Sequence, residues 1–479
     1  MNKASPPSCE ASDMAEIIQR AKPLAVNPLK ASQPVGAALA FLGLRKSIPM
    51  LHGSQGCTAF GKVFLVRHFR EPIPLQTTAL DQVAAVMNPD AAVIEGLKVI
   101  CDKNKPEVIG LPTTGLTETQ GTDIRGVVTA FRARHPEFAH VAVVPVNTPD
   151  FAGCLETGFA LAVEAIIGVL VPESRVVGRR RKQVNVLAGS ALTPGDIEAL
   201  KDWIEAFGLR PVVLPDLGDS LDGHLVDQET TPLTLGGTPK DEIAAMGESI
   251  ATFVVGRSLA RAADLLKSRT GVPDLRFDHL MGLDACDAFT QALATVSGQP
   301  VPDKLERQRA QLQDAMVDSH FMAGFARVAV AADPDMLLGF CRFFHGVGAE
   351  IVAAVAPVKA ECLTEAPCPQ VRVGDLEDLE RIAAAAHAQL IVGNSHAALL
   401  ADRLGLPLFR AGFPLYDRVG AYARPWIGYR GGRQALFDFA NLILGQHHDI
   451  PAYRSRFWQD GPRDWESDRP AAGAGLVRH

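Results

Sequence analysis

The chain has 479 residues, of which 47% are hydrophobic and 21% charged, which is enough apolar material for about three domains with ordinary cores. Its formal net charge of −7 argues against a general nucleic-acid binder, which would carry a basic excess. Eight cysteines are too few for a disulfide framework in a chain of this length, and the sequence has no C-x-x-C pair to suggest a self-contained zinc or redox site.

No segment of the sequence predicts membrane insertion or export. The longest apolar stretch, residues 158–171, is interrupted by Glu164 and is too short to cross a bilayer. The N-terminal residues lack the apolar region of a signal peptide. We therefore expect a cytoplasmic protein whose partners include neither a membrane nor a nucleic acid.

The first part of the chain predicts a tail followed by an α/β domain. Residues 1–25 are polar and contain proline and serine, which favours a flexible tail. Over residues 26–180, apolar strand-like runs alternate with helical patterns, as in a parallel α/β sheet. One predicted strand ends at Leu51, and two more cover residues 107–111 and 141–146.

Two further α/β domains are predicted, at 181–324 after the basic run 179–182 and at 325–445. The second opens with a strand at 183–189 and a helix that Thr193 caps and Pro194 begins. In the third we expect an opening strand from residue 327, helices at 336–345 and 397–404, strands at 350–356, 389–394 and 406–410, and a helix end at Gly405. Residues 446–479 are polar and rich in proline and glycine, which predicts a second flexible tail.

Cys57 is the residue that points most directly to chemistry. It follows the first predicted strand, in a glycine-rich segment (residues 53–61) that we expect to be a loop of the first domain. Ligands of α/β sheets bind at the carboxyl ends of strands, and glycines let a backbone approach a bulky group closely. A free cysteine is more often a small buried hydrophobe. If Cys57 binds a metal cluster, the other ligands must come from another chain, because one thiolate cannot hold a cluster.

The same segment nearly matches a phosphate-binding P-loop from Gly56 to Lys62. Val63 stands where a P-loop requires a serine or threonine hydroxyl for Mg²⁺, and valine has no oxygen to offer. A nucleotide-binding protein is therefore a less favoured alternative.

Several motifs together resemble one protein family. Residues 49–57 and the sequence Arg-His-Phe-Arg-Glu-Pro at 67–72 are similar to β-type subunits of nitrogenase component 1 and their paralogues. The motifs at 393–396, 410–414 and 417–418 are similar to the third domain of the same family. The resemblance extends from about residue 25 to about 445. It implies three Rossmann-like α/β domains with parallel sheets, and a heterotetramer of two chain types.

Within that family, the catalytic β subunit carries three cysteines that help hold the P-cluster, and this sequence matches only one of them, at Cys57. Ser32 and Gly115 stand at the other two positions. A serine hydroxyl is a poor replacement for a thiolate ligand, and glycine has no side chain. The chain therefore resembles the cofactor-assembly branch of the family more closely than the catalytic subunit of nitrogenase. The related dark-operative protochlorophyllide reductase also shares one cluster between unlike chains, but the motifs at 67–72 and 410–414 favour the nitrogenase branch. Both enzymes remain the alternatives.

The resemblance implies a scaffold subunit with no stand-alone catalysis and no catalytic residue. Its partner would be a NifE-like chain, with which it would share a 4Fe-4S cluster held by Cys57 and three cysteines of the partner. A precursor of the iron-molybdenum cofactor would be carried mainly by that partner, so no cofactor-pocket residue is named in this chain. The nitrogenase iron protein would be a transient partner.

The remaining cysteines and three histidines favour structural roles. Cys9 lies in the predicted tail, Cys101 in a predicted helix, and three others in or beside apolar segments, which favours inert thiols. Cys362 and Cys368 are six residues apart across a proline-containing loop and make a weak candidate metal pair. The three buried candidates are Cys154, Cys286 and Cys341, and the histidines that we expect to pack or cap are His52, His68 and His396.

Overall fold

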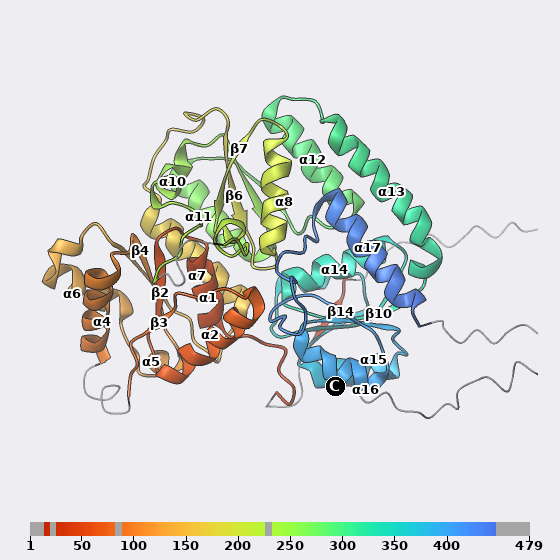
Figure 1. The fold of residues 1–479 in the computed structure, drawn as a ribbon, viewed down its shortest axis with the longest axis horizontal. Helices are drawn as coiled ribbons and strands as arrows, with labels where there is room; N and C mark the ends of the chain where they lie inside the picture. The colour runs from red at the N-terminus through yellow and green to blue at the C-terminus, as the bar shows by residue number, and fades with distance from the viewer. Residues whose placement is uncertain (1–13, 20–24, 82–88, 226–231, 447–479) are drawn as a thin grey trace, which may run out of the picture.

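The computed structural model describes four stretches of the chain and builds them into three parallel β-sheets with flanking helices (Figure 1). The first sheet lies at the lower left of the view, the second at the top and the third at the lower right. No helix among the described residues is long and apolar enough to cross a membrane. The described residues are 14–19, 25–81, 89–225 and 232–446.

The first sheet has the strand order β3-β2-β4-β5 and contains the three strands predicted there, each to within one residue. Strands β2 and β4 are buried along their whole length, as expected for parallel strands covered on both faces. The strands are β2 (Ser47–Leu51), β3 (Gln76–Thr77), β4 (Val108–Pro112) and β5 (Ala142–Val146), and the helices α1 (Gln33–Leu42), α2 (Gln55–Phe69), α4 (Pro89–Asn104), α5 (Gly115–Thr119), α6 (Ile124–Arg134) and α7 (Leu155–Leu170).

Helices α1 and α7 cross so closely that two glycines are required at the crossing. A Cβ atom on Gly36 would lie 1.9 Å from the carbonyl oxygen of Leu155. One on Gly158 would lie 2.0 Å from the carbonyl oxygen of Gln33. Both distances are far below van der Waals contact, so the two backbones touch at this point. This contact fixes the N-terminal end of α1 against that of α7.

The second and third sheets also consist of parallel strands. Their orders are β7-β6-β8-β9 and β1-β12-β11-β10-β13-β14, and Thr193 and Pro194 begin α8 as predicted. The second unit contains β6 (Gln183–Ala188), α8 (Pro194–Glu205), β7 (Arg210–Leu214), β8 (Ala251–Val255), α11 (Ala260–Thr270), β9 (Asp274–Phe277), α12 (Leu283–Ser297) and α13 (Asp303–Ala323). The third contains β10 (Arg327–Ala331), α14 (Pro334–Gly346), β11 (Glu350–Ala356), β12 (Gln370–Val373), α15 (Leu376–Ala385), β13 (Leu390–Gly393), α16 (Ala398–Leu404) and β14 (Leu408–Arg410).

Two elements cross between the units that the sequence suggested. Strand β1 (Glu16–Ile18) pairs in parallel with β12 at the edge of the third sheet, so the prediction of a flexible tail is wrong for these residues. Three residues are too few to show a strand pattern in the sequence. Helix α17 (Gly428–Leu444) follows the third sheet but packs beside α13 of the second unit (Figure 1). The rest of the two predicted tails lies outside the described residues, apart from residues 14, 15, 19, 25 and 446.

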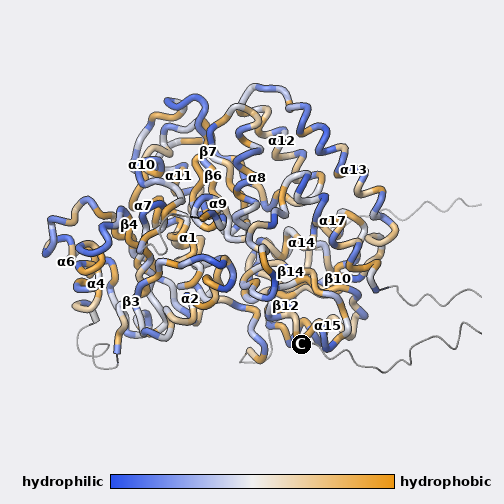
Figure 2. Tube along the Cα trace, in the orientation of Figure 1, coloured by the Kyte–Doolittle hydropathy of each residue, from blue (hydrophilic) through white to orange (hydrophobic). Residues whose placement is uncertain are grey.

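One hydrophobic cluster extends through all three units. It includes α1 and α7 of the first unit, the strands of the second, and α14 and α17 of the third. Trp203 of α8 illustrates this continuity, because its ring lies 5.7 Å from that of Tyr429 on α17. In Figure 2, α1 is mostly hydrophobic, whereas α13 on the outside shows long hydrophilic stretches. The three units therefore share one core, and the first and third units each have a further hydrophobic cluster of their own.

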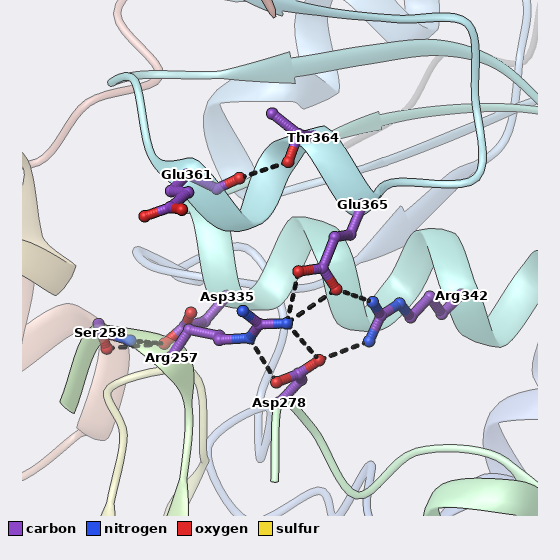
Figure 3. A network of polar contacts seen from close by, with 8 residues as sticks. All are labelled: Arg257, Ser258, Asp278, Asp335, Arg342, Glu361, Thr364 and Glu365. Atoms are coloured by element: carbon purple, nitrogen blue, oxygen red, sulfur yellow. Dashed lines mark hydrogen bonds and ion pairs between the residues drawn. The ribbon is translucent and has the colours of Figure 1, made fainter. Parts of the chain in front are cut away.

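A ring of four charged side chains joins the second unit to the third (Figure 3). Arg257 contacts Asp278 at 2.6 Å and Glu365 at 2.7 Å, and Arg342 of α14 contacts the same two carboxylates at 2.6 and 2.7 Å. Although burial opposes the shift, hydrogen bonds from both arginines lower the pKa of Asp278. Each carboxylate is thus shared by two guanidinium groups, which fastens the junction without leaving a buried charge unpaired.

Two buried carboxyl groups, of Glu156 and Asp335, and the half-buried one of Asp333 lie at the junction of the first and third units. The backbone nitrogen of Asp335 donates to Glu156 at 2.9 Å, and Asp333 in return accepts hydrogen bonds from the thiol of Cys154 and the backbone of Glu156. The N-terminal turns of α7 and α14 therefore cap each other. Asp335 also accepts from the backbone nitrogen and hydroxyl of Ser258, at 3.0 and 2.6 Å, so the second unit joins the same contact.

This cluster predicts that the protein is more stable at mildly acidic pH than at alkaline pH. Burial raises the pKa of Asp333 to about 6, and burial together with the Asp335 charge raises the pKa of Glu156. The native state thus binds protons that the unfolded state releases near pH 4, so stability falls as the pH rises through 4 to 6 and beyond. Glu156→Gln keeps an acceptor for Asp335 without the charge. We expect it to raise the free energy of unfolding at pH 8 by about 1 kcal/mol, the equivalent of a pKa shift of roughly one unit.

Urea unfolding at pH 5.5 and pH 8 measures this effect, and the gain should shrink at the lower pH. Glu173→Gln is the matched control, because that side chain is 80% exposed and makes only a 3.9 Å contact. An equal change in the free energy of unfolding in both variants would contradict the proposed effect of the Glu156 charge. So would a gain in that free energy at pH 5.5 as large as the gain at pH 8.

Candidate functional site

Three segments meet at the carboxyl end of the first sheet, where the sequence predicted the site. They follow β2, β4 and β5 and carry Cys57, Gly115 and Asp150. The hydroxyl of Thr114 donates to the carbonyl of His52 at 3.0 Å, which ties the first two segments together. The backbone nitrogen of Gly115 donates to Asp150 at 3.0 Å, which ties the second to the third.

Cys57 lies in the first turn of α2, so the prediction that it sits in a loop is wrong. The helix begins at Gln55, directly after the extended residue Ser54, whose hydroxyl lies 3.4 Å from the Cys57 sulfur. Glycine disfavours helix formation, and the segment shows no apolar periodicity, so the sequence does not predict that α2 begins at Gln55. This placement bears on the chemistry of Cys57, because the partial positive charge at the N-terminus of a helix favours an anionic group such as a thiolate ligand.

The glycines around Cys57 serve packing in this structure. A Cβ atom on Gly53 would lie 2.4 Å from the hydroxyl oxygen of Thr114, and one on Gly61 would lie 3.3 Å from Val35 of α1. Residues 56–62 are helical, so their backbone N–H groups do not form the open loop by which a P-loop cradles phosphate. This geometry argues against the nucleotide-binding alternative.

The two positions that lack a cysteine lie at the starts of two further helices. Ser32 is the residue before α1, and Gly115 is the first residue of α5. A Cβ atom on Gly115 would lie 3.3 Å from a carboxylate oxygen of Asp150, so Asp150 occupies the space beside it. The residues present therefore do not fit a P-cluster half-site, whereas they fit a cluster that takes a single thiolate from this chain.

The other described cysteines are held as thiols by burial. Burial raises the pKa of Cys101 and Cys368 to about 11 and that of Cys362 to about 12. A protonated thiol is a poor metal ligand, and all the described cysteines are free of disulfide bonds. The pKa is also raised by burial at Cys154, Cys286 and Cys341. Cys9 lies outside the described residues.

In the described part of the chain, no three His, Cys, Asp or Glu side chains are placed to hold a metal ion. The histidines pack, as expected. Nδ1 of His52 bonds the Thr78 hydroxyl at 3.1 Å, and burial lowers the pKa of His52 to about 4. Nδ1 of His68 accepts from the backbone of Leu415 at 2.8 Å, and burial lowers its pKa to about 3. His396 packs between the rings of Phe64 and Tyr416, at 5.9 and 5.8 Å.

The surface beside Cys57 carries several exposed apolar side chains. On α2, Phe60 is 72% exposed, and Val63 and Val66 are also exposed along the same helix. Leu116 and Phe151, which directly follow Gly115 and Asp150, are exposed as well. Exposed apolar side chains that gather in one region mark surfaces that bind other proteins. The half-buried Cys57 therefore belongs to a region suited to contact with a second chain.

Contacts that the sequence could not reveal hold α2 against the third unit. The guanidinium of Arg67 stacks 4.1 Å from the ring centre of Tyr416, and Arg70 donates to the carbonyl of Tyr416 at 3.0 Å. Asp417 accepts from Arg410 at 2.9 Å and from the hydroxyl of Ser395 at 2.5 Å. The two groups of motifs, more than 300 residues apart in the chain, thus form one structure that positions the helix bearing Cys57.

Comparison with known proteins decides the family. Residues 32–444 match the family of nitrogenase component 1 type oxidoreductases. The nitrogenase iron-molybdenum cofactor biosynthesis protein NifN of Klebsiella pneumoniae is 46% identical over 447 residues, which cover 93% of this chain and 97% of the relative. The chain belongs to the nitrogenase component 1 family, in its NifN group. The NifN protein of a Nostoc strain is likewise 46% identical, over 90% of this chain and 96% of its own length.

A chain of the solved structure of nitrogenase Cp1 at pH 6.5 has the same fold, with a TM-score of 0.84. It is 29% identical and covers 92% of this chain and 98% of its own. The predicted fold class and the predicted resemblance to nitrogenase component 1 are therefore confirmed. The comparisons do not test which residues bind a cluster, so the role of Cys57 remains a prediction.

Proposed function

We propose that this chain is the β-like subunit of a NifEN-type scaffold on which the iron-molybdenum cofactor of nitrogenase is assembled. The observation that carries the proposal is the state of the first-sheet site: one half-buried cysteine at a helix N-terminus, with Ser32 and Gly115 at the other two family positions. The names of its relatives support the same role.

In this proposal, Cys57 supplies one of four thiolates of a 4Fe-4S cluster, and a NifE-like partner supplies the other three. A 4Fe-4S cluster is held by four thiolates, and the buried thiols of this chain are poor candidates. The cluster would provide a one-electron relay between the two chains. The exposed side chains of Phe60, Val63, Leu116 and Phe151 would be covered by the partner.

The precursor of the iron-molybdenum cofactor would be carried mainly by the partner, and the complex would form a cytoplasmic heterotetramer that the iron protein meets transiently. The chain itself would complete the interface and hold Cys57 in place. The contacts of Arg67 and Arg70 with Tyr416 support this positioning role, because they fix α2 from the opposite end.

Anaerobic purification of the chain alone, of the NifE-like partner alone and of the co-expressed pair tests the proposal. We expect a stoichiometric cluster, seen by iron analysis and EPR, only in the pair. A complete cluster on this chain alone would refute the shared site. A P-cluster signal in the pair would instead identify a nitrogenase β subunit.

A further inference from the structure

A second concave site lies on the third unit, apart from Cys57. It is a hollow of about 330 Å³ between the end of β14, the segment that follows it and helix α17. This volume lies within the range of small-molecule sites, about 300–1,000 Å³. Three arginines line the hollow, Arg410, Arg418 and Arg424. Arg410 pairs with Asp417 in the structure that positions α2, whereas Arg418, which follows Asp417 in the same motif, makes none of the contacts described there.

The charges around the hollow do not cancel. Arg410 is neutralised by Asp417 at 2.9 Å, and Arg424 contacts Asp438 of α17. Arg418 forms no ion pair with any described residue, and it is exposed. One full positive charge is therefore left over at the hollow, in a chain whose formal net charge is −7.

Arg424 adds an oriented donor to this charge. Its guanidinium lies 4.1 Å from the ring centre of Trp426 and 5.5 Å from that of Phe409, which fixes its plane. Its buried Nε has no hydrogen-bond partner among the described residues. Burial lowers the pKa of Arg424; the charge of Asp438 opposes this shift, and the nearby charge of Arg418 adds to it. Arg418 and Arg424 thus place two guanidinium groups that repel each other beside one hollow, an arrangement that an anion would stabilise.

We propose that this hollow binds a small oxyanion, either a polycarboxylate or a phosphate compound. Arg418 and Arg424 would hold its oxygens through charge-assisted hydrogen bonds, and Trp426 would form the wall behind it. The hollow shares Arg410 with the contacts that position α2, through Asp417, so a bound anion would also brace that connection.

Isothermal titration calorimetry of the full-length chain at a constant 150 mM NaCl tests this site, with citrate and pyrophosphate as probes. We expect saturable binding of at least one probe. Arg418→Gln should weaken it about tenfold or more, the effect of one lost charge-assisted hydrogen bond. The affinity of Arg418→Lys for the probe should fall between those of the natural chain and Arg418→Gln, because lysine keeps the charge but not the planar pair of donors. Binding of citrate alone would identify a polycarboxylate site, and of pyrophosphate alone a phosphate site.

Arg381→Gln is the matched control. Arg381 is an exposed arginine of α15 that forms no ion pair with a described residue and lies outside the hollow. Its replacement should leave the affinity within about twofold. The proposal is overturned if neither probe binds, or if the Arg381 and Arg418 variants lose affinity equally. This outcome is independent of whether Cys57 binds a cluster, because the titration requires no iron and no partner.

Discussion

Replacing Cys57 with alanine should remove the proposed shared cluster from the complex while leaving the two chains associated. The substitution deletes one of four proposed thiolates, and an iron left without its ligand is exposed to solvent, so the cluster should be lost or its reduction potential changed. Pairing should survive, because α/β domains of this size bury enough apolar surface to fold without a metal. Iron analysis, EPR and size-exclusion chromatography of the co-purified pair measure the three outcomes.

Cys368→Ala is the control for this experiment, since Cys368 is also half-buried but lies far along the chain in the third unit, and burial raises its pKa. It should retain the iron content of the natural protein. Full iron content in the Cys57→Ala variant would exclude Cys57 as a cluster ligand. Complete dissociation of the pair would show that the cluster holds the chains together.

The same variant separates an electron-relay role from a structural one. In an assembly assay with iron protein, molybdate, homocitrate and reductant, activation of cofactor-free nitrogenase should slow markedly, while precursor loading on the partner stays largely intact. Normal activation by a variant shown to lack the cluster would rule out the relay. Loss of the precursor would indicate a structural role for Cys57.

The second large effect should come from Gly36→Ala, at the crossing of α1 and α7. The added methyl group would lie 1.9 Å from a backbone carbonyl oxygen, so neither a rotamer change nor a side-chain shift can relieve the clash. The two helices must separate, and we expect a loss of about 3 kcal/mol in the free energy of unfolding, at the upper end for overpacked cores. Urea unfolding of the chain, followed by circular dichroism, measures it.

Gly346→Ala is the matched control, because Gly346 is the last residue of α14 and a Cβ atom there would meet nothing within 4 Å. That variant should be neutral or slightly more stable, since alanine favours a helix over glycine. A Gly36 variant as stable as the Gly346 variant would mean that the crossing of α1 and α7 can relax.

The sequence revealed the elements of the parallel sheets well because each strand is a short apolar run that ends at polar or glycine residues. Strand β11 has the bounds predicted, and the cap of α8 at Thr193 was correct. The sequence failed where the structure depends on distant partners. Strand β1 forms only because β12 offers an open edge, and α2 begins at Gln55, inside the segment 53–61 that the sequence predicts as a loop.

The candidate site shows the same division. Its position at a strand end and its single cysteine could be predicted from residues close together in the chain. The contacts that hold it could not, because Tyr416 and Asp150 approach α2 and α5 from distant parts of the sequence. The arginine hollow was likewise invisible, since its charge balance depends on the pairing of Arg424 with Asp438 across the start of α17.

The crossing elements constrain how the chain can be made. Strand β1 emerges from the ribosome first, yet its partner β12 is synthesised some 350 residues later. Helix α13 is translated long before α17, and until then Leu312 lacks the neighbour at Gly432, beside which a Cβ atom would lie 3.8 Å away. During synthesis the second unit can therefore form only in part. Translation must reach α17 before the second and third units can complete their packing. The chain therefore becomes able to bind a partner only once all three units have been synthesised, rather than domain by domain.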